Sequence, residues 1–550
     1  SASGSDPQAI YFTEREDELG QQESRIEKFD DSYRWSDEAG NWLNYDDDGQ
    51  LIEGGDRNTV VTRTTRDAQN RIFQVLDANN SLIMTYEYLD ATSNKIKSIE
   101  DYSGRSVQYH WQGEQLAGIT DVNGERWDYA YSSTGDLITL TDPLERKTQI
   151  DYVSGIVTRI TQPIGAYVEY TYDYDEIRKR YYVREKNSSG TIIEKYYDQS
   201  GMLLEQRIDG LLIRKTSENT SGLNKTRLIK AFNGSSVTQT FNQQGKLIKS
   251  LNNDGSFETA EYNGPYNKIS KHRDVRGKVT AFEYDANGNV KRIIEAVGTA
   301  LSRSLEFEYD EFGQRLNINY PADALTLAST FHNTYDAYGN VKTVTDALGN
   351  IRTYQYNVLA RIIQSTDANQ QVWKNTFNAS GDLLTTEDPL GRQYQASYNA
   401  AGERTKVIAP NGRISLNQYD TAGRVVGFEV RGPDQAVLTR SLANYNDTDR
   451  SITYTDALGY SASKVFNSLG QVESTTNRAG EISSFQYQQG ILAATKVLDY
   501  GRYFSYDLAG NINQETIKWG DSQEHNSQDQ STQENNIVRQ RTLNASGHAT

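Results

Sequence analysis

Cysteine is absent from this sequence of 550 residues, and histidine occurs only five times, at positions 110, 272, 332, 525 and 548. The absence of cysteine excludes a disulfide framework and any cysteine-ligated zinc or iron–sulfur site. No apolar run reaches the roughly 18 residues that a membrane-spanning helix needs, so we expect no membrane span. Five histidines are few for catalysis that depends on histidine pairs or triads.

A basic region is also missing. Lys and Arg number 57 against 74 Asp and Glu, which gives a formal net charge of −17. Because an acidic chain repels phosphate groups, we expect no nucleic acid as a partner. Residues 1–60 hold 16 acidic and 5 basic side chains and so carry −11 of that charge. We predict an acidic N-terminal segment over residues 1–32, which is either a solvated lead-in or a surface that docks a basic partner.

The first five residues, Ser1-Ala-Ser-Gly-Ser5, resemble a linker, and no cleavable signal peptide is visible. We therefore expect the chain to begin inside a longer gene product.

Tyrosine and glycine, by contrast, are abundant, with 37 Tyr against 15 Phe and 42 Gly. An internal repeat explains both. Its aromatic residue recurs every 21 residues from Tyr335 to Tyr419, within the string Tyr-Asp-x-x-Gly or a softer version of it, and a second turn such as Asp346-Ala-Leu-Gly349 lies half a period further on. About six strand-forming residues separate the turns, too few for a helix, so one unit is a β-hairpin of about 21 residues. We predict an all-β fold of repeated antiparallel β-hairpins in one continuous sheet.

The turn residues follow from hairpin chemistry. The Asp can accept a hydrogen bond from a backbone N–H two residues on, and the Gly takes the left-handed conformation at no steric cost. We predict no catalytic, cofactor-binding or metal-binding residue. The candidate site residues are structural turn residues: Tyr197, Asp198, Gly201, Tyr284, Asp285, Gly288, Tyr309, Asp310, Gly313, Tyr335, Asp336, Gly339, Asp346, Gly349, Tyr419, Asp420, Gly423, Tyr506, Asp507 and Gly510.

The hydrophobic content is only 36% even with Tyr included, which suits a sheet one layer thick that is wet on both faces. Paired aromatics such as Tyr354 and Tyr356 alternate along a strand so that both face one side. Tyr suits such a wall because its ring packs, and we expect its hydroxyl to reach water.

At these motifs the chain resembles the YD-repeat, or RHS-repeat, family. The segment from Tyr335 to Tyr356 (Tyr-Asp-Ala-Tyr-Gly-Asn-Val-Lys-Thr-Val-Thr-Asp-Ala-Leu-Gly-Asn-Ile-Arg-Thr-Tyr-Gln-Tyr) is close to an ideal unit. The resemblance covers residues 33–515, with degenerate repeats over 176–260. It includes bacterial Rhs effectors, the B and C components of Tc toxins, wall-associated polymorphic toxins and the teneurins, and it implies that the sheet spirals into a hollow or partly open shell.

The bacterial shells are typically closed by a C-terminal core with a combined Gly-rich, Asn-Pro and Asp-Pro-x-Gly signature, and that combination is not found here. The two Asp-Pro-Leu strings, at Asp142 and Asp388, occupy ordinary repeat positions, so we interpret them as turns. Residues 516–550 are then a polar insertion or tail. The segment 520–536 lacks apolar side chains and is either a linker or the tip of a last hairpin whose next strand begins at Ile537.

Three further features have competing interpretations. The basic run 177–184 is a solvent-facing strand or, alternatively, an anion site. The acidic strings at 46–49 and 285–289 superficially resemble calcium loops, but the twelve-residue pattern with its closing Glu is not met, so turn chemistry is favoured. The tryptophans could stack on sugars, although packing within the wall is favoured for most: Trp35, Trp42, Trp111, Trp127, Trp373 and Trp519.

Taken with the resemblance, these features predict a non-enzymatic repeat scaffold without a cofactor, part of a secreted or cell-surface bacterial toxin protein. Such a scaffold encloses or presents a C-terminal toxin, or cargo domain, of the same polypeptide. The alternative is a cell-surface adhesion or carbohydrate-binding module with a glycan partner. An enzyme is a distant third, which rests only on the many carboxylates.

Overall fold

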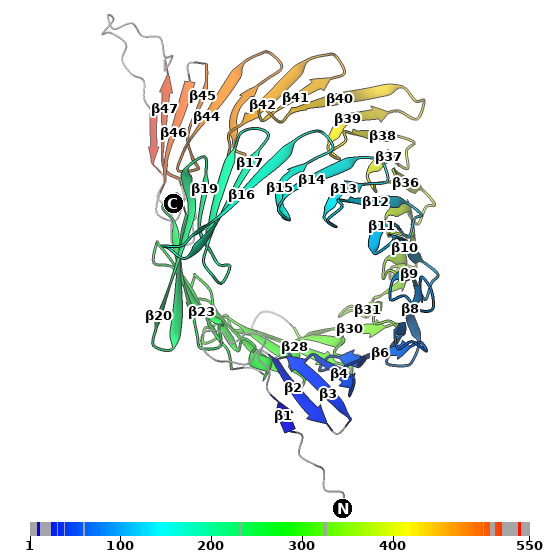
Figure 1. Cartoon of the computed structure of the whole chain (residues 1–550). Coiled ribbons are helices and arrows are strands. Elements are labelled where there is room, and N and C mark those ends of the chain that lie inside the picture. Colours follow the sequence, from blue (N-terminus) through cyan, green and yellow to red (C-terminus); the bar gives the residue numbers. More distant parts are fainter. Residues whose placement is uncertain are drawn as a thin grey trace, which may run out of the picture. The chain divides into compact units, whose positions relative to one another are not determined.

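The structure is a computed structural model that describes residues 8–10, 24–29, 31–37, 39–58, 61–231, 233–263, 265–322, 327–498, 500–506, 512–519 and 537–540. Within these residues it contains 48 strands in one sheet and a single short 3₁₀ turn, η1 (Pro265–Asn267). The prediction of an all-β fold is confirmed. In Figure 1 the colour changes gradually from one arrow to the next, because neighbours in the sequence are neighbours in the sheet.

The chain divides into two compact units. Unit 1 comprises Ser1–Asp128, Phe241–Lys249 and Glu258–Gln395, and unit 2 comprises Tyr129–Thr240, Ser250–Phe257 and Ala396–Thr550. Each unit therefore contains two runs of hairpins that are far apart in the sequence. In unit 1 we call residues 31–128 the first run and 258–395 the second run. In unit 2 the first run is 129–240 and the second run is 396–519.

The strands up to the end of the first run of unit 1 are β1 (Gln8–Ile10), β2 (Ser24–Phe29), β3 (Ser32–Asp37), β4 (Trp42–Asp46), β5 (Leu51–Gly55), β6 (Val61–Arg66), β7 (Ile72–Asp77), β8 (Leu82–Tyr88), β9 (Ile96–Asp101), β10 (Ser106–Gln112), β11 (Gln115–Thr120) and β12 (Arg126–Tyr131). Those that follow are β13 (Leu137–Thr141), β14 (Lys147–Val153), β15 (Ile156–Thr161), β16 (Tyr167–Asp175), β17 (Arg180–Asn187), β18 (Ile192–Tyr197), β19 (Leu203–Ile208), β20 (Leu211–Ser221), β21 (Asn224–Ala231) and β22 (Ser236–Phe241).

The next strands, which lead into and form the second run of unit 1, are β23 (Leu247–Asn252), β24 (Phe257–Glu261), β25 (Lys271–Arg273), β26 (Val279–Tyr284), β27 (Val290–Glu295), β28 (Arg303–Tyr309), β29 (Arg315–Tyr320), β30 (Ser329–Tyr335), β31 (Val341–Thr345), β32 (Ile351–Tyr356), β33 (Ile362–Thr366), β34 (Val372–Phe377), β35 (Leu383–Glu387) and β36 (Gln393–Tyr398). The remaining strands are β37 (Arg404–Ile408), β38 (Ile414–Tyr419), β39 (Val425–Arg431), β40 (Val437–Asn446), β41 (Ser451–Asp456), β42 (Ser461–Phe466), β43 (Val472–Thr476), β44 (Ile482–Gln488), β45 (Ile491–Val497), β46 (Tyr500–Tyr506), β47 (Ile512–Trp519) and β48 (Ile537–Gln540).

The 21-residue repeat gives two kinds of turn. An aromatic turn follows the strand that ends in the repeat aromatic, as Tyr335 of β30 is followed by the turn 336–339, and an alternate turn such as 346–349 lies half a repeat later. The strands β30 and β31 pair antiparallel with a register shift at Tyr335, so this aromatic turn includes a bulge, and the same shift occurs at Tyr356 and Tyr419. The two kinds of turn alternate along the sheet, and therefore lie on its two opposite edges.

The sheet buries very little. Among the described residues the buried hydrophobic side chains are Phe307, Val407, Ile414, Val430, Ala494 and Ile517, and no large side chain is fully buried. The low hydrophobic content of the sequence thus matches a single layer. Stability must come from cross-strand hydrogen bonds and from many half-buried contacts, rather than from one core.

Repeats continue through the region where the sequence is degenerate. Residues 176–260 still form antiparallel hairpins, including the longest strand, β20, which pairs with β21 over its last eight residues. At the other end, β48 pairs antiparallel with β47, with Ile517 opposite Ile537. Residues 520–536, between these two strands, and most of residues 1–23 lie outside the described residues.

Candidate functional site

The turn aspartates act through their side chains. Asp336 Oδ1 accepts the backbone N–H of Tyr338 and of Asn340, each at 2.9 Å, and Gly339 N–H donates to the Asp336 carbonyl at 3.1 Å. The same pattern of acceptance from the residue four positions on holds at Asp198, Asp285, Asp310, Asp346 and Asp420. Each Asp side chain therefore accepts hydrogen bonds from turn N–H groups that would otherwise bond to water.

The fourth residue of the turn is left-handed. Gly339 has φ +82°, and Gly201, Gly288, Gly313, Gly349 and Gly423 are also positive. Some turns place a side chain there instead: Glu145, Ala360 and Gln370 have φ of +62°, +54° and +63°. A side chain with a Cβ has a steric cost in this region, so these turns are strained. Asp507 and Gly510 lie outside the described residues.

The tyrosines join one hairpin to the next. The hydroxyl of Tyr356 donates to the carbonyl of Val341, the first residue of β31, at 2.8 Å. Equivalent bonds to a carbonyl 14 to 20 residues earlier are made by Tyr88, Tyr152, Tyr262, Tyr284, Tyr309, Tyr335, Tyr419, Tyr445, Tyr487 and Tyr506. Each of these hydroxyls thus donates to a backbone oxygen of the preceding hairpin, a role that the expectation of contact with water did not include. Tyr197 ends β18 without such a bond among the described residues.

In two hairpins a donor other than a tyrosine hydroxyl makes this bond. Phe377 ends β34, and the side-chain amide of Asn375 donates to the Ile362 carbonyl at 2.9 Å, which lies 15 residues before Phe377. In β10 the indole N–H of Trp111 donates to the Ile96 carbonyl at 2.8 Å. In these two hairpins the carbonyl is thus satisfied by a donor other than a tyrosine, as a half-buried acceptor requires.

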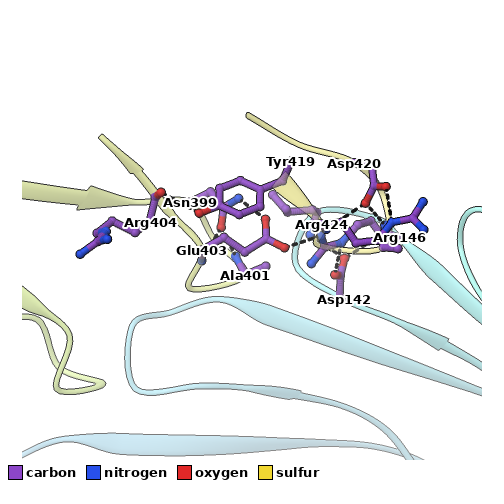
Figure 2. Close-up of polar contacts among 11 residues, drawn as sticks. Asp142, Arg146, Asn399, Ala401, Glu403, Arg404, Tyr419, Asp420 and Arg424 are labelled. Atoms are coloured by element: carbon purple, nitrogen blue, oxygen red, sulfur yellow. Dashed lines mark hydrogen bonds and ion pairs between the residues drawn. The ribbon is translucent and has the colours of Figure 1, made fainter. Parts of the chain in front are cut away.

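A second set of contacts joins the two runs within each unit. In unit 2, Arg146 follows the alternate turn 142–145 and binds its own Asp142 through Nε at 2.5 Å. Its Nη1 reaches Glu403 Oε1 in the second run at 2.8 Å, across 257 residues of sequence. Figure 2 shows Arg146 between these two carboxylates, with Glu403 held by Asn399 Nδ2 at 2.7 Å.

The electrostatics of this ion pair favour the charged forms. The side chains of Arg146 and Glu403 are only 14% and 15% exposed. Burial alone would lower the pKa of Arg146, but the hydrogen bonds to Glu403 and Asp142 outweigh it and raise that pKa. Because the charges are partly removed from water, loss of one partner would leave the other in an unfavourable environment.

Unit 2 has another contact of this kind. Arg450, at the aromatic turn after β40, donates from Nη1 to the Ser189 carbonyl at 3.3 Å and to Thr191 Oγ1 at 3.4 Å. Beside it lies a cavity of about 440 Å³ whose lining includes Tyr167 and Phe466. The two runs are therefore in contact at Arg450 and leave a gap next to it.

Unit 1 repeats the arrangement with different chemistry. Arg105 binds its own Asp101 and donates from Nη1 to the Ala379 carbonyl at 3.1 Å. Three other contacts lie along the same two edges: Asn123 Nδ2 with Ser380 Oγ at 2.5 Å, the Asn58–Asn289 amide pair at 3.0 Å, and the stacked rings of Tyr102 and Tyr338 at 5.7 Å. In both units, alternate turns of the first run meet aromatic turns of the second run. We call each such line of contacts a seam.

The other predicted features contribute less. Arg178 and Lys179 of the basic run are 69% and 60% exposed, whereas Arg180 is 19% exposed and stacks on Tyr196 at 4.1 Å. Asp46 accepts backbone N–H groups of its own turn, as turn chemistry requires. Within the described ranges, no cluster of three or more His, Asp or Glu side chains could hold a metal ion, and no helix is long and apolar enough to cross a membrane.

Sequence reasoning found the turns but not their long-range partners. The seam depends on which turns of two distant runs come together, and no sequence spacing encodes that. The tyrosine bonds did leave a signal, since Tyr exceeds Phe at the repeat position and Asn375 precedes Phe377 by two residues.

Comparison with known proteins identifies a family for this chain. The family model described as "Teneurin YD-shell" matches residues 36–422, well over half of the chain. No curated protein matches the sequence. Among solved structures, the chain is similar to "TcdB2-TccC3-TEV" (12% identity, TM-score 0.45, covering 94% of this chain and 27% of that one) and to the Photorhabdus luminescens Tc holotoxin pore (11% identity, TM-score 0.27, 98% and 37%). The chain thus spans between about a quarter and two fifths of the length of these structures.

Proposed function

This chain belongs to the teneurin YD-shell family, and on that premise we propose that it is a non-enzymatic wall that encloses or presents a C-terminal toxin, or cargo domain, of a longer secreted bacterial protein. The mechanism is containment. A wall of hairpins keeps the cargo away from solvent and from its targets until release.

The observation that carries this proposal is the seam. Hairpins in a row make a ribbon, and a ribbon alone leaves its turns exposed on both edges. The contacts of Arg146 with Glu403 and of Arg105 with Ala379 join two runs laterally, 257 and 274 residues apart, and so turn a ribbon into a wall. The thin, half-buried sheet suits a barrier better than it suits a binding pocket.

The test uses the longer natural polypeptide and limited proteolysis. We expect its C-terminal region to resist protease while the wall is intact. The variant Arg146→Gln opens the seam in unit 2 and should increase cleavage of that region. The matched control is Arg352→Gln, because Arg352 is an exposed arginine on a strand and not at a seam. Equal and rapid cleavage of the cargo in all three proteins would contradict containment.

The described tryptophans do not favour the adhesion alternative. Trp35, Trp42, Trp111, Trp127 and Trp373 are all half-buried in the sheet. Trp42 and Trp111 also donate their indole N–H groups to backbone carbonyls. A sugar-stacking ring needs an open face, and these rings pack within the wall instead.

A further inference from the structure

The seam uses only one edge of each run. In both units, the alternate turns of the first run pack on the aromatic turns of the second run, as Arg105 packs on Ala379 and Arg146 on Glu403. Within the described residues of each unit, two edges make no such contact: the alternate turns of the second run and the aromatic turns of the first run. Each of these edges is built from the same kind of turn as an edge that takes part in a seam.

Arg392 marks the first of these leftover edges in unit 1. Like Arg105 and Arg146, it is the residue after an alternate turn, and it binds its own Asp388 through Nε at 2.6 Å. The guanidinium groups of Arg105 and Arg146 then reach across a seam, and their side chains are 24% and 14% exposed. Arg392 is 61% exposed, and among the described residues its hydrogen bonds go only to its own turn.

Leucines at the turn tips show the same difference between engaged and leftover edges. Leu144, in the alternate turn that contacts Glu403, is 38% exposed. At the equivalent position of second-run turns, Leu348 is 88% exposed, Leu390 is 75% and Leu458 is 82%. In unit 1 two strongly exposed leucines, Leu348 and Leu390, lie on the same edge as an arginine with unused donors, which is typical of a docking surface rather than of a solvated edge.

We propose that this edge, formed in unit 1 by the turns 346–349, 367–370 and 388–391, docks the aromatic edge of the first run of a second copy of the chain. A second copy supplies the right chemistry. Its aromatic turn 46–49 carries Asp47 and Asp48, both exposed, which offer Arg392 the carboxylate that Glu403 offers Arg146. The two surfaces differ, so the association is head-to-tail and can add further copies.

Sedimentation velocity of the 550-residue chain over a range of concentrations tests the proposal. We expect concentration-dependent association, weakened about tenfold or more by Arg392→Gln, as is usual for the loss of a charge-assisted hydrogen bond. Arg440→Gln, which changes an exposed arginine in the middle of β40, is the matched control and should leave association unchanged. A chain that stays monomeric at every concentration would overturn the proposal, as would association that Arg392→Gln does not weaken.

Disulfide trapping identifies the surfaces, because the chain has no cysteine of its own. Leu390→Cys is mixed in turn with Asp47→Cys and with Ala68→Cys, which lies in the turn 67–70 on the same edge as the turn 46–49. We expect heterodimers between a Leu390→Cys copy and at least one of these partners. Cross-links only between identical variants would refute head-to-tail docking. Protease protection of the cargo is a separate measurement, so either proposal can fail without the other.

Discussion

The tyrosine bond between hairpins leads to a quantitative prediction. Tyr356→Phe removes one hydroxyl and keeps the ring, so packing is unchanged and only the hydrogen bond to the Val341 carbonyl is lost. A hydrogen bond of this kind contributes about 0.5–1.5 kcal/mol to folding, and a half-buried carbonyl left without a partner adds to the loss. We expect the hairpins around β31 and β32 to be destabilised by about 1 kcal/mol.

Hydrogen exchange read by mass spectrometry is the suitable assay, because a repeat protein need not unfold in one step. A loss of about 1 kcal/mol should speed exchange of the peptides that span 341–356 about fivefold. Tyr354→Phe is the control. Tyr354 lies two residues away on the same strand, and its hydroxyl has no hydrogen-bond partner among the described residues.

The repeat position that lacks a hydroxyl should respond in the same way. Asn375→Leu should speed exchange around the Ile362 carbonyl by a similar factor, because Asn375 there performs the function of the tyrosine. If Tyr356→Phe and Tyr354→Phe have equal effects, or if neither changes exchange, then the hydroxyl bonds do not stabilise the wall.

Three further predictions concern the turns, the tyrosines and the seam. Gly339→Ala should cost about 1 kcal/mol in a urea titration, whereas Ala360→Gly should stabilise by up to about 1 kcal/mol, since both residues are left-handed. Burial raises the pKa of Tyr284, Tyr356 and Tyr487, so their contribution to stability is complete below about pH 10 and is lost as the pH rises through the folded values. Circular dichroism should therefore show unfolding coupled to tyrosinate absorbance, and ionisation of these rings at about pH 10 without loss of structure would contradict this. Arg146→Gln should speed hydrogen exchange in both turns of its seam, 142–145 and 399–402, and an effect confined to the first turn would mean that the ion pair with Glu403 does not join the runs.

The hairpins could be predicted from the sequence because each turn is formed by contacts between residues close together in the chain. Asp336 and Gly339 determine their turn through contacts within four residues, so their spacing in the sequence reports the structure directly. Turns such as that at Ala360 were less evident, because they lack the glycine that marks the others. The backbone at Ala360 is strained, and the surrounding hairpins hold it in that conformation.

The seam could not be predicted from the sequence, for a physical reason. Whether Arg146 meets Glu403 depends on the curvature and twist that accumulate over many hairpins, and no single residue determines these. The tyrosine hydroxyls illustrate an intermediate case. Their preference over phenylalanine was visible in the sequence, but the carbonyl of the preceding hairpin that accepts their hydrogen bond was not.

An electron-microscopy map of the longer natural polypeptide tests the central claim most directly. The account predicts a wall one hairpin layer thick, with neighbouring runs joined turn to turn at Arg146 and Arg105, and with density for the C-terminal cargo on its inner side. A solid or unwound rod of hairpins, with no internal cavity and with the two runs apart, would contradict it.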